Sequence, residues 1–90
     1  MHISENFVMR EIAGERVIVP IGEEASRFHG LITVNDSGAF LWNILQKSDT
    51  TLDQLKKAFT AEYGIDLETA ESDIKSFLNI LRVRNILHDA

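Results

Sequence analysis

The chain has 90 residues, of which 44% are hydrophobic and 26% charged, with a formal net charge of −5. This balance predicts one globular domain over residues 1–90 and argues against a disordered segment. The negative charge argues against broad contact with nucleic acid or an anionic membrane, because phosphate neutralisation requires clustered Lys and Arg. The absence of cysteine excludes disulfides and cysteine zinc sites. With no targeting segment or membrane span visible, we expect a cytoplasmic protein.

The first predicted elements are two strands, over 7–12 and 16–21, which are rich in Val, Ile and Phe. The connection Ala13-Gly14-Glu15 contains Gly, and a three-residue link of this kind predicts a hairpin. Pro20 lacks a backbone donor, which is tolerated at a strand end or on an edge. The polar segment 22–27 is expected to be a loop before a third strand.

That third strand, over 29–34, runs directly into a helix. Residues 31–34 are apolar or β-branched, as suits a half-buried strand, and Asn35 then supplies an N-cap oxygen. The spacing of apolar residues predicts a first helix from about Asp36 to Gln46. One short segment therefore ends the sheet and begins the helices, and this junction is the first place to look for a binding groove. The expected buried face is Phe40, Leu41, Ile44 and Leu45.

Two further helices follow. Thr50 and Asp53 have the spacing of a capping box that begins the second helix, which Gly64 ends. Asp66 is a suitable cap for a third helix reaching about Arg84. Asn85 is the expected stop, and 86–87 are expected to form an extended segment lying against the sheet. The expected buried residues are Leu52, Leu55, Ala58 and Phe59 in the second helix and Ala70, Ile74, Phe77, Leu78 and Leu81 in the third.

The third helix has an apolar face that is wider than a three-helix core requires. We interpret Phe77 and Ile80 as the apolar floor of a groove, with Asp73 and Arg84 as polar ends. In the alternative, Ile80 simply touches the sheet or the carboxyl end of the chain. If the strand over 29–34 is a sheet edge, an added peptide strand would lie beside this helix.

This order of elements resembles the PqqD family, which is named after the pyrroloquinoline quinone biosynthesis protein D. The resemblance extends from about Phe7 to Leu87, and its most specific part is the strand-to-helix segment that ends at Trp42. The residues that carry it are Asn35, Gly38, Ala39, Leu41 and Trp42, then Thr51, Leu52, Leu55, Tyr63, Gly64 and Ile65, and finally Asp73, Ile74, Phe77, Leu78, Leu81, Ile86 and Leu87.

The resemblance implies an α+β fold, namely a winged helix-turn-helix with an N-terminal three-stranded antiparallel sheet followed by three helices. It also implies a recognition element that binds the leader of a ribosomally made precursor peptide as an extra strand. The implied partner is a modifying enzyme, often a radical SAM protein. The implied peptide-binding residues are Leu31, Ile32, Thr33 and Val34 on the strand and Asp73, Phe77, Ile80 and Leu81 on the helix, to which the groove interpretation adds Arg84.

Other functional classes are less well supported by the sequence. The three histidines are far apart and lack metal-ligand spacing, and no nucleophile stands beside a base, so we expect no metal, cofactor or catalytic residue. A winged helix-turn-helix could instead bind DNA, but the third helix begins with Asp66, Glu68, Glu71 and Asp73, which repel phosphate. A structural subunit that dimerises or swaps a strand through its free edge is a further alternative.

Overall fold

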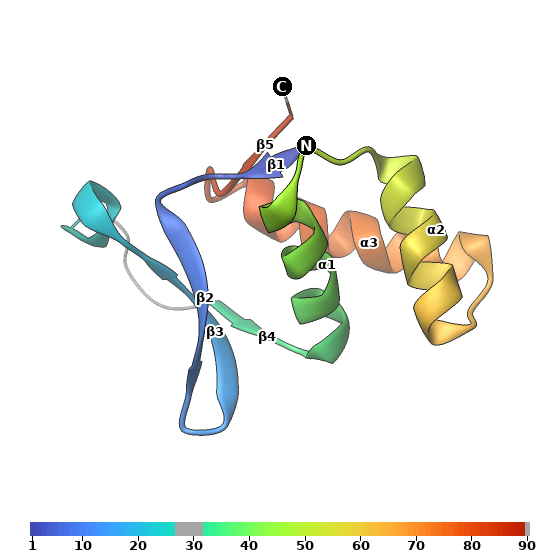
Figure 1. Ribbon diagram of the computed structural model, residues 1–90, viewed down its shortest axis with the longest axis horizontal. Helices are drawn as coiled ribbons and strands as arrows, with labels where there is room; N and C mark the ends of the chain where they lie inside the picture. The colour runs from blue at the N-terminus through green and yellow to red at the C-terminus, as the bar shows by residue number, and fades with distance from the viewer. Residues whose placement is uncertain (27–31, 90) are drawn as a thin grey trace.

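The chain folds into an antiparallel sheet followed by three helices, so the fold is α+β (Figure 1). The computed structural model describes residues 1–26 and 32–89. Strands β2 (Phe7–Ile12), β3 (Glu15–Pro20) and β4 (Ile32–Val34) form the sheet in the order β2-β3-β4, with both pairs antiparallel. The central strand is therefore β3, and β4 lies on the side that leads into the helices.

The hairpin between β2 and β3 is tighter than the sequence predicted. Ile12 pairs with Glu15, so the loop has the two residues Ala13 and Gly14 and not three. Both residues have positive φ, 53° and 82°, as in the type I′ turn whose twist matches that of the flanking strands. Pro20 ends β3, as expected for a residue without a backbone donor. The segment predicted to be an irregular loop contains a short 3-10 helix, η1 (Gly22–Ser26).

The first helix, α1 (Asp36–Lys47), begins where β4 ends. The Asn35 side chain accepts a hydrogen bond of 2.8 Å from the Gly38 N–H, which confirms Asn35 as the cap. Ser37 also donates its hydroxyl to the same Asn35 oxygen, at 3.0 Å. These contacts fix the direction in which α1 leaves the sheet.

The second helix, α2 (Leu52–Tyr63), begins one residue later than predicted. Thr51 and Gln54 form the capping box, with reciprocal bonds of 3.2 and 2.9 Å. The prediction of Thr50 and Asp53 was wrong because Thr50 is drawn into the interior, where it is 3% exposed. The predicted stop at Gly64 is confirmed by its left-handed conformation.

The third helix, α3 (Leu67–Arg82), has the predicted cap, since Asp66 accepts the Thr69 N–H at 2.7 Å. It ends two residues before the predicted Arg84, and Asn85 then takes a left-handed φ of 59°. The chain continues into β5 (Leu87–His88), which pairs with β1 (His2–Ile3) as a separate two-stranded sheet rather than joining the first one. Strand β1 was not predicted, because two residues are too few for a periodic pattern.

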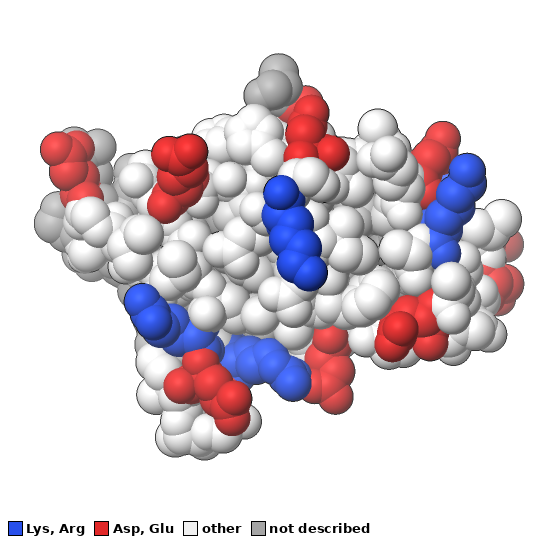
Figure 2. Space-filling view, viewed as in Figure 1, with Lys and Arg blue, Asp and Glu red and all other residues white. Residues whose placement is uncertain are grey.

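Charged side chains are spread over the surface. On the face shown in Figure 2, Lys and Arg are interspersed with Asp and Glu and form no broad basic surface. Exposed carboxylates of α3 include Glu68 and Asp73, in the first half of the helix. On this face, the described part of the chain thus lacks the clustered positive charge that binding to a phosphate backbone requires.

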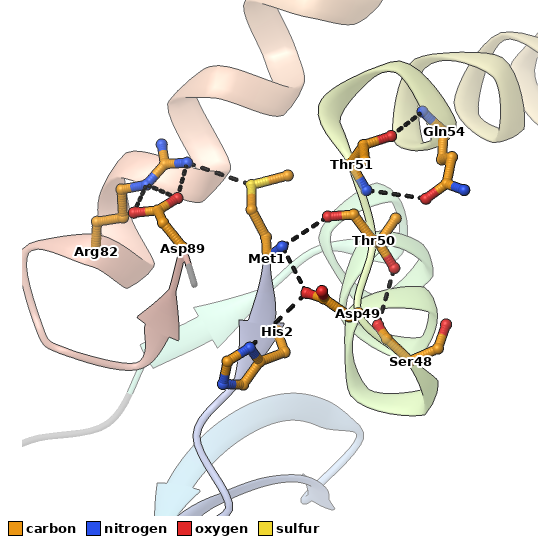
Figure 3. Close-up of polar contacts among 9 residues, drawn as sticks. All are labelled: Met1, His2, Ser48, Asp49, Thr50, Thr51, Gln54, Arg82 and Asp89. Carbon is orange, nitrogen blue, oxygen red and sulfur yellow. Dashed lines mark hydrogen bonds and ion pairs between the residues drawn. The ribbon is translucent and has the colours of Figure 1, made fainter.

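Contacts of Met1, the residue before β1, hold the connection between α1 and α2 in place (Figure 3). The Thr50 N–H donates to the Met1 carbonyl at 2.8 Å, and Asp49 accepts a hydrogen bond of 2.8 Å from the Met1 ammonium. Nearby, Arg82 at the end of α3 pairs with Asp89 at 2.7 Å. The two ends of the described chain therefore meet near the carboxyl end of α1, away from the junction of β4 with α1 (Figure 1).

The hydrophobic core lies between the sheet, the three helices and the β1–β5 pair. Trp42 is completely buried, and the indole N–H donates to Gln46 at 3.1 Å. Within the residues described, every buried side-chain nitrogen and oxygen has a hydrogen-bond partner. The core residues with the least exposure are Ile18, Leu41, Trp42, Leu45, Leu55, Ala70, Ile74, Leu78, Leu81 and Ile86.

Candidate functional site

A groove of about 360 Å³ lies where β4, the first turn of α1 and α3 meet. Its volume is at the lower end of the range typical of ligand sites. The groove is lined by Ile32, Thr33, Val34, Asn35, Ser37, Gly38, Leu41, Phe59, Asp73, Ser76, Phe77 and Ile80.

One wall of the groove is β4, which is an edge strand. Among the described strands, β4 pairs only with β3. An edge strand keeps one row of N–H and C=O groups that another extended chain can pair with. Within β4, Val34 is buried, Ile32 is half-buried and Thr33 is exposed. Val34 therefore anchors the strand in the core, and no described strand pairs with the other side of β4.

The opposite wall is one face of α3. Asp73, Ser76, Phe77 and Ile80 have the spacing i, i+3, i+4 and i+7, which places them in one stripe along a helix. Ile80 is 41% exposed, so neither the sheet nor the carboxyl end of the chain covers it fully. This exposure favours the groove interpretation of Ile80 over the alternative in which it only packs against the chain itself.

The groove floor consists of residues that the sequence did not single out for this site. Leu41 of α1 and Phe59 of α2 are 2% and 3% exposed, so each shows only a small part of its side chain. Gly38 brings α1 close to α3, since a Cβ at this position would lie 3.2 Å from Cε1 of Phe77. Ser76 could have been identified from its helical spacing to Asp73 and Ile80. The contributions of Phe59 and Leu41 depend on how three helices pack.

Two of the residues predicted for the site, Leu81 and Arg84, do not line the groove. Leu81 is completely buried in the core, because one helical step of about 100° from Ile80 turns it towards Ile74 and Leu78. Arg84 lies beyond the end of α3, where its guanidinium makes a long contact of 3.5 Å with the Ile80 carbonyl. Leu31 lies outside the described residues. Ile32, Thr33, Val34, Asp73, Phe77 and Ile80 do line the groove, and their role in binding stays a prediction.

Of the two carboxylates at or next to the groove, one is paired within the described residues and the other is not. Asp36, next to the groove residue Asn35, is paired with Arg16 of β3, and this pairing raises the pKa of the Arg16 guanidinium. Among the described lining residues, Asp73 alone has a charged side chain, and it has no hydrogen bond or ion pair with any described residue. The groove thus offers apolar surface with a single carboxylate beside it.

The described residues contain no group of three or more His, Asp or Glu placed to hold a metal ion. In the same residues we find no helix whose length and hydropathy would let it span a lipid bilayer. The described lining residues of the groove present main-chain groups, apolar surface and one carboxylate.

Comparisons with known proteins agree with this geometry. A family model described as "Coenzyme PQQ synthesis protein D (PqqD)" matches residues 15–87. A solved structure described as "TbiB1 in Complex with the TbiA(beta) Leader Peptide" has a TM-score of 0.76 and 24% sequence identity, and covers 100% of this chain and 98% of that one. This likeness shows that the two chains share a fold. No curated protein matches the chain.

Proposed function

The chain belongs to the PqqD family, and from this premise we propose that it is a non-catalytic recognition element for the leader region of a ribosomally made precursor peptide. The leader would bind as an added strand on β4, beside α3, and be presented to a modifying enzyme. The observation that carries the proposal is the open edge of β4 next to the apolar groove.

The two walls of the groove would have separate tasks. In strand addition, main-chain hydrogen bonds supply affinity, and pockets that receive alternate side chains supply specificity. The free side of β4 supplies the main-chain groups, while Phe77 and Ile80 supply the apolar surface for inward-facing side chains. The short connection from β4 to α1, held by the Asn35 cap, sets the position of β4 relative to α1, and the close approach of Phe77 to Gly38 places α3 against the first turn of α1.

Further support comes from the structural relative, which was solved with a leader peptide bound. Because the fold is shared over the whole chain, the same arrangement of strand and helix is available here. By family resemblance we extend the proposal to a radical SAM maturase as the enzyme served, acting in the cytoplasm.

The experiment uses the leader peptide of a precursor encoded beside this chain's gene, labelled with a fluorophore and titrated with the full chain. We expect micromolar or tighter affinity by fluorescence anisotropy. Phe77→Asp should abolish binding, because it puts a charge on the apolar wall of the groove. Leu67→Asp is the matched control, since Leu67 is on the same helix, is 59% exposed and does not line the groove. Equal binding by both variants would remove the groove from the proposal.

A second measurement tests strand addition itself. A peptide strand bonds to an edge through the N–H groups of alternate residues. N-methylation of single leader residues should therefore weaken binding at every second position and leave the positions between them nearly unaffected. Losses without this period of two would contradict addition to β4.

The other two functional classes are tested with the same protein. We expect no salt-dependent affinity for random duplex DNA at low ionic strength, since the first half of α3 is acidic. Sedimentation velocity, with and without the leader peptide, distinguishes a recognition element from a structural subunit. Measurable DNA affinity, or a stable dimer that the leader neither joins nor dissociates, would replace the proposal with one of these alternatives.

A further inference from the structure

The groove also indicates which side chains the bound peptide strand, here called the guest, would carry. We propose that the bound strand carries a basic side chain facing Asp73, two residues away from an apolar side chain that packs on Phe77. This inference rests on the proposed strand addition at β4 and specifies the class of peptide that the site selects.

The charge of the guest follows from the state of Asp73. Its carboxylate stands at the groove, and no described residue donates to it or pairs with it. An added strand would shield this carboxylate from water on one side, which costs free energy unless the strand provides a donor or a positive charge. A Lys or Arg side chain offers both, whereas an acidic side chain at the same place would be repelled.

Within residues 1–26 and 32–89, no Lys or Arg takes that role. Lys75, two residues further along α3, pairs with Glu71 at 3.2 Å, and Lys56 approaches the same carboxylate at 3.7 Å. Arg16 is paired with Asp36. The positive partner of Asp73 is therefore expected to come with the peptide.

The spacing in the guest follows from the geometry of a helix beside a strand. Asp73 and Phe77 are four residues apart on α3, which corresponds to about 6 Å along the helix axis. Alternate residues of an extended strand, which point to the same side, are separated by roughly 6.6 Å. A guest strand running along α3 can therefore place consecutive inward-facing side chains over Phe77 and Asp73. The motif is a basic and an apolar residue at positions i and i+2, in an order set by the direction of the strand.

The test is a selection from a random decapeptide library with the purified full chain, followed by anisotropy titration of the enriched peptides. Wild type should enrich peptides with Lys or Arg two positions from an apolar residue. Asp73→Asn should remove the basic preference, and Asp73→Lys should replace it with Asp or Glu. Asp53→Asn is the matched control, because Asp53 is an exposed carboxylate on α2 that does not line the groove.

In the titrations, replacing the basic residue of an enriched peptide by Gln should weaken binding to wild type by about three- to five-fold, as for a partly exposed ion pair. The same replacement should leave binding to Asp73→Asn unchanged, and the difference in wild type should shrink as NaCl is raised.

The outcomes separate this inference from the proposal beneath it. Enriched peptides that bind wild type but not Phe77→Asp, and that show no preference for Lys or Arg, would overturn the inference and leave strand addition intact. The same holds if Asp73→Asn enriches basic peptides as strongly as wild type does. A library in which no enriched peptide depends on Phe77 overturns both.

Discussion

The ring of Phe77 on α3 lies against the backbone of Gly38 in the first turn of α1. A Cβ placed on Gly38 would stand 3.2 Å from Cε1 and 3.4 Å from Cδ1 of this ring, and 3.2 Å from the Asn35 side-chain oxygen. The absence of a side chain at position 38 therefore lets Phe77 sit low enough to form a wall of the groove. Gly38 in the first turn of α1 and the ring of Phe77 on α3 are therefore closely packed.

This relationship predicts a measurable coupling between the two positions. In the wild-type background, Gly38→Ala should lower the free energy of unfolding by about 1 kcal/mol, because the methyl group crowds the Phe77 ring. In a Phe77→Ala background, the same change should cost less or raise it, by at most roughly 0.5–1 kcal/mol, since Ala favours a helix over Gly and only the Asn35 oxygen then lies close to the new methyl group. Urea denaturation of the four proteins of this double-mutant cycle gives the coupling.

The control for this cycle is Ala39→Gly, at the position next to Gly38 in α1. A second glycine, Gly64, is unsuitable as a control because its positive φ would strain any side chain placed there. Ala39→Gly should destabilise the protein by a similar amount in the wild-type and Phe77→Ala backgrounds. If Gly38→Ala also changes the free energy of unfolding by the same amount in both backgrounds, the close packing of Gly38 against Phe77 is contradicted.

Leu81 and Ile80 are adjacent but should behave in opposite ways. Leu81 is fully buried, so Leu81→Ala should reduce the free energy of unfolding by about 2–5 kcal/mol. Ile80 is 41% exposed at the groove, so Ile80→Ala should cost less than about 1 kcal/mol yet weaken leader binding. Thermal unfolding and peptide titration at a temperature where both variants are folded provide the comparison. A direct role of Leu81 in binding would appear as weak binding by a folded Leu81→Ala protein.

The Asp66 cap should make the stability of α3 depend on pH. The Thr69 backbone N–H, and then its hydroxyl, donate to the Asp66 carboxylate and lower its pKa in the folded protein. A group whose pKa is lowered by folding contributes stability that is present above the unfolded-state pKa, about 3.9, and is lost as the pH falls through the folded-state value. Asp66→Asn keeps a capping oxygen but does not titrate. Between about pH 5 and about pH 2.5, a range that includes this pKa, its melting temperature should therefore fall less than that of wild type.

Asp66→Ala completes this experiment, because it removes the cap at every pH. Its melting temperature should be lower than that of Asp66→Asn at neutral pH. If wild type and Asp66→Asn lose the same amount on acidification, the cap does not contribute to the acid sensitivity of the fold.

Local signals in the sequence determined much of this structure. Asn35, Gly64 and Asp66 mark helix ends through hydrogen bonds and backbone conformations that involve only near neighbours, so their roles could be read without a fold. Helical spacing likewise placed Phe77 and Ile80 on one flank of α3, and the segment through Trp42 indicated the family. The ends that were misplaced, at Thr50 and Arg84, are those where a local signal competes with other contacts.

Tertiary structure alone decided the remainder. The pairing of β1 with β5 joins residues more than 80 positions apart, and Phe59 reaches the groove only because α2 packs against α3. Leu81 faces the core and not the groove because of the orientation of α3 about its own axis. The apolar face of α3 is so wide that its sequence alone does not determine this orientation. The sequence thus determines what is set by neighbours along the chain, while the shape of the groove depends on how separate elements pack.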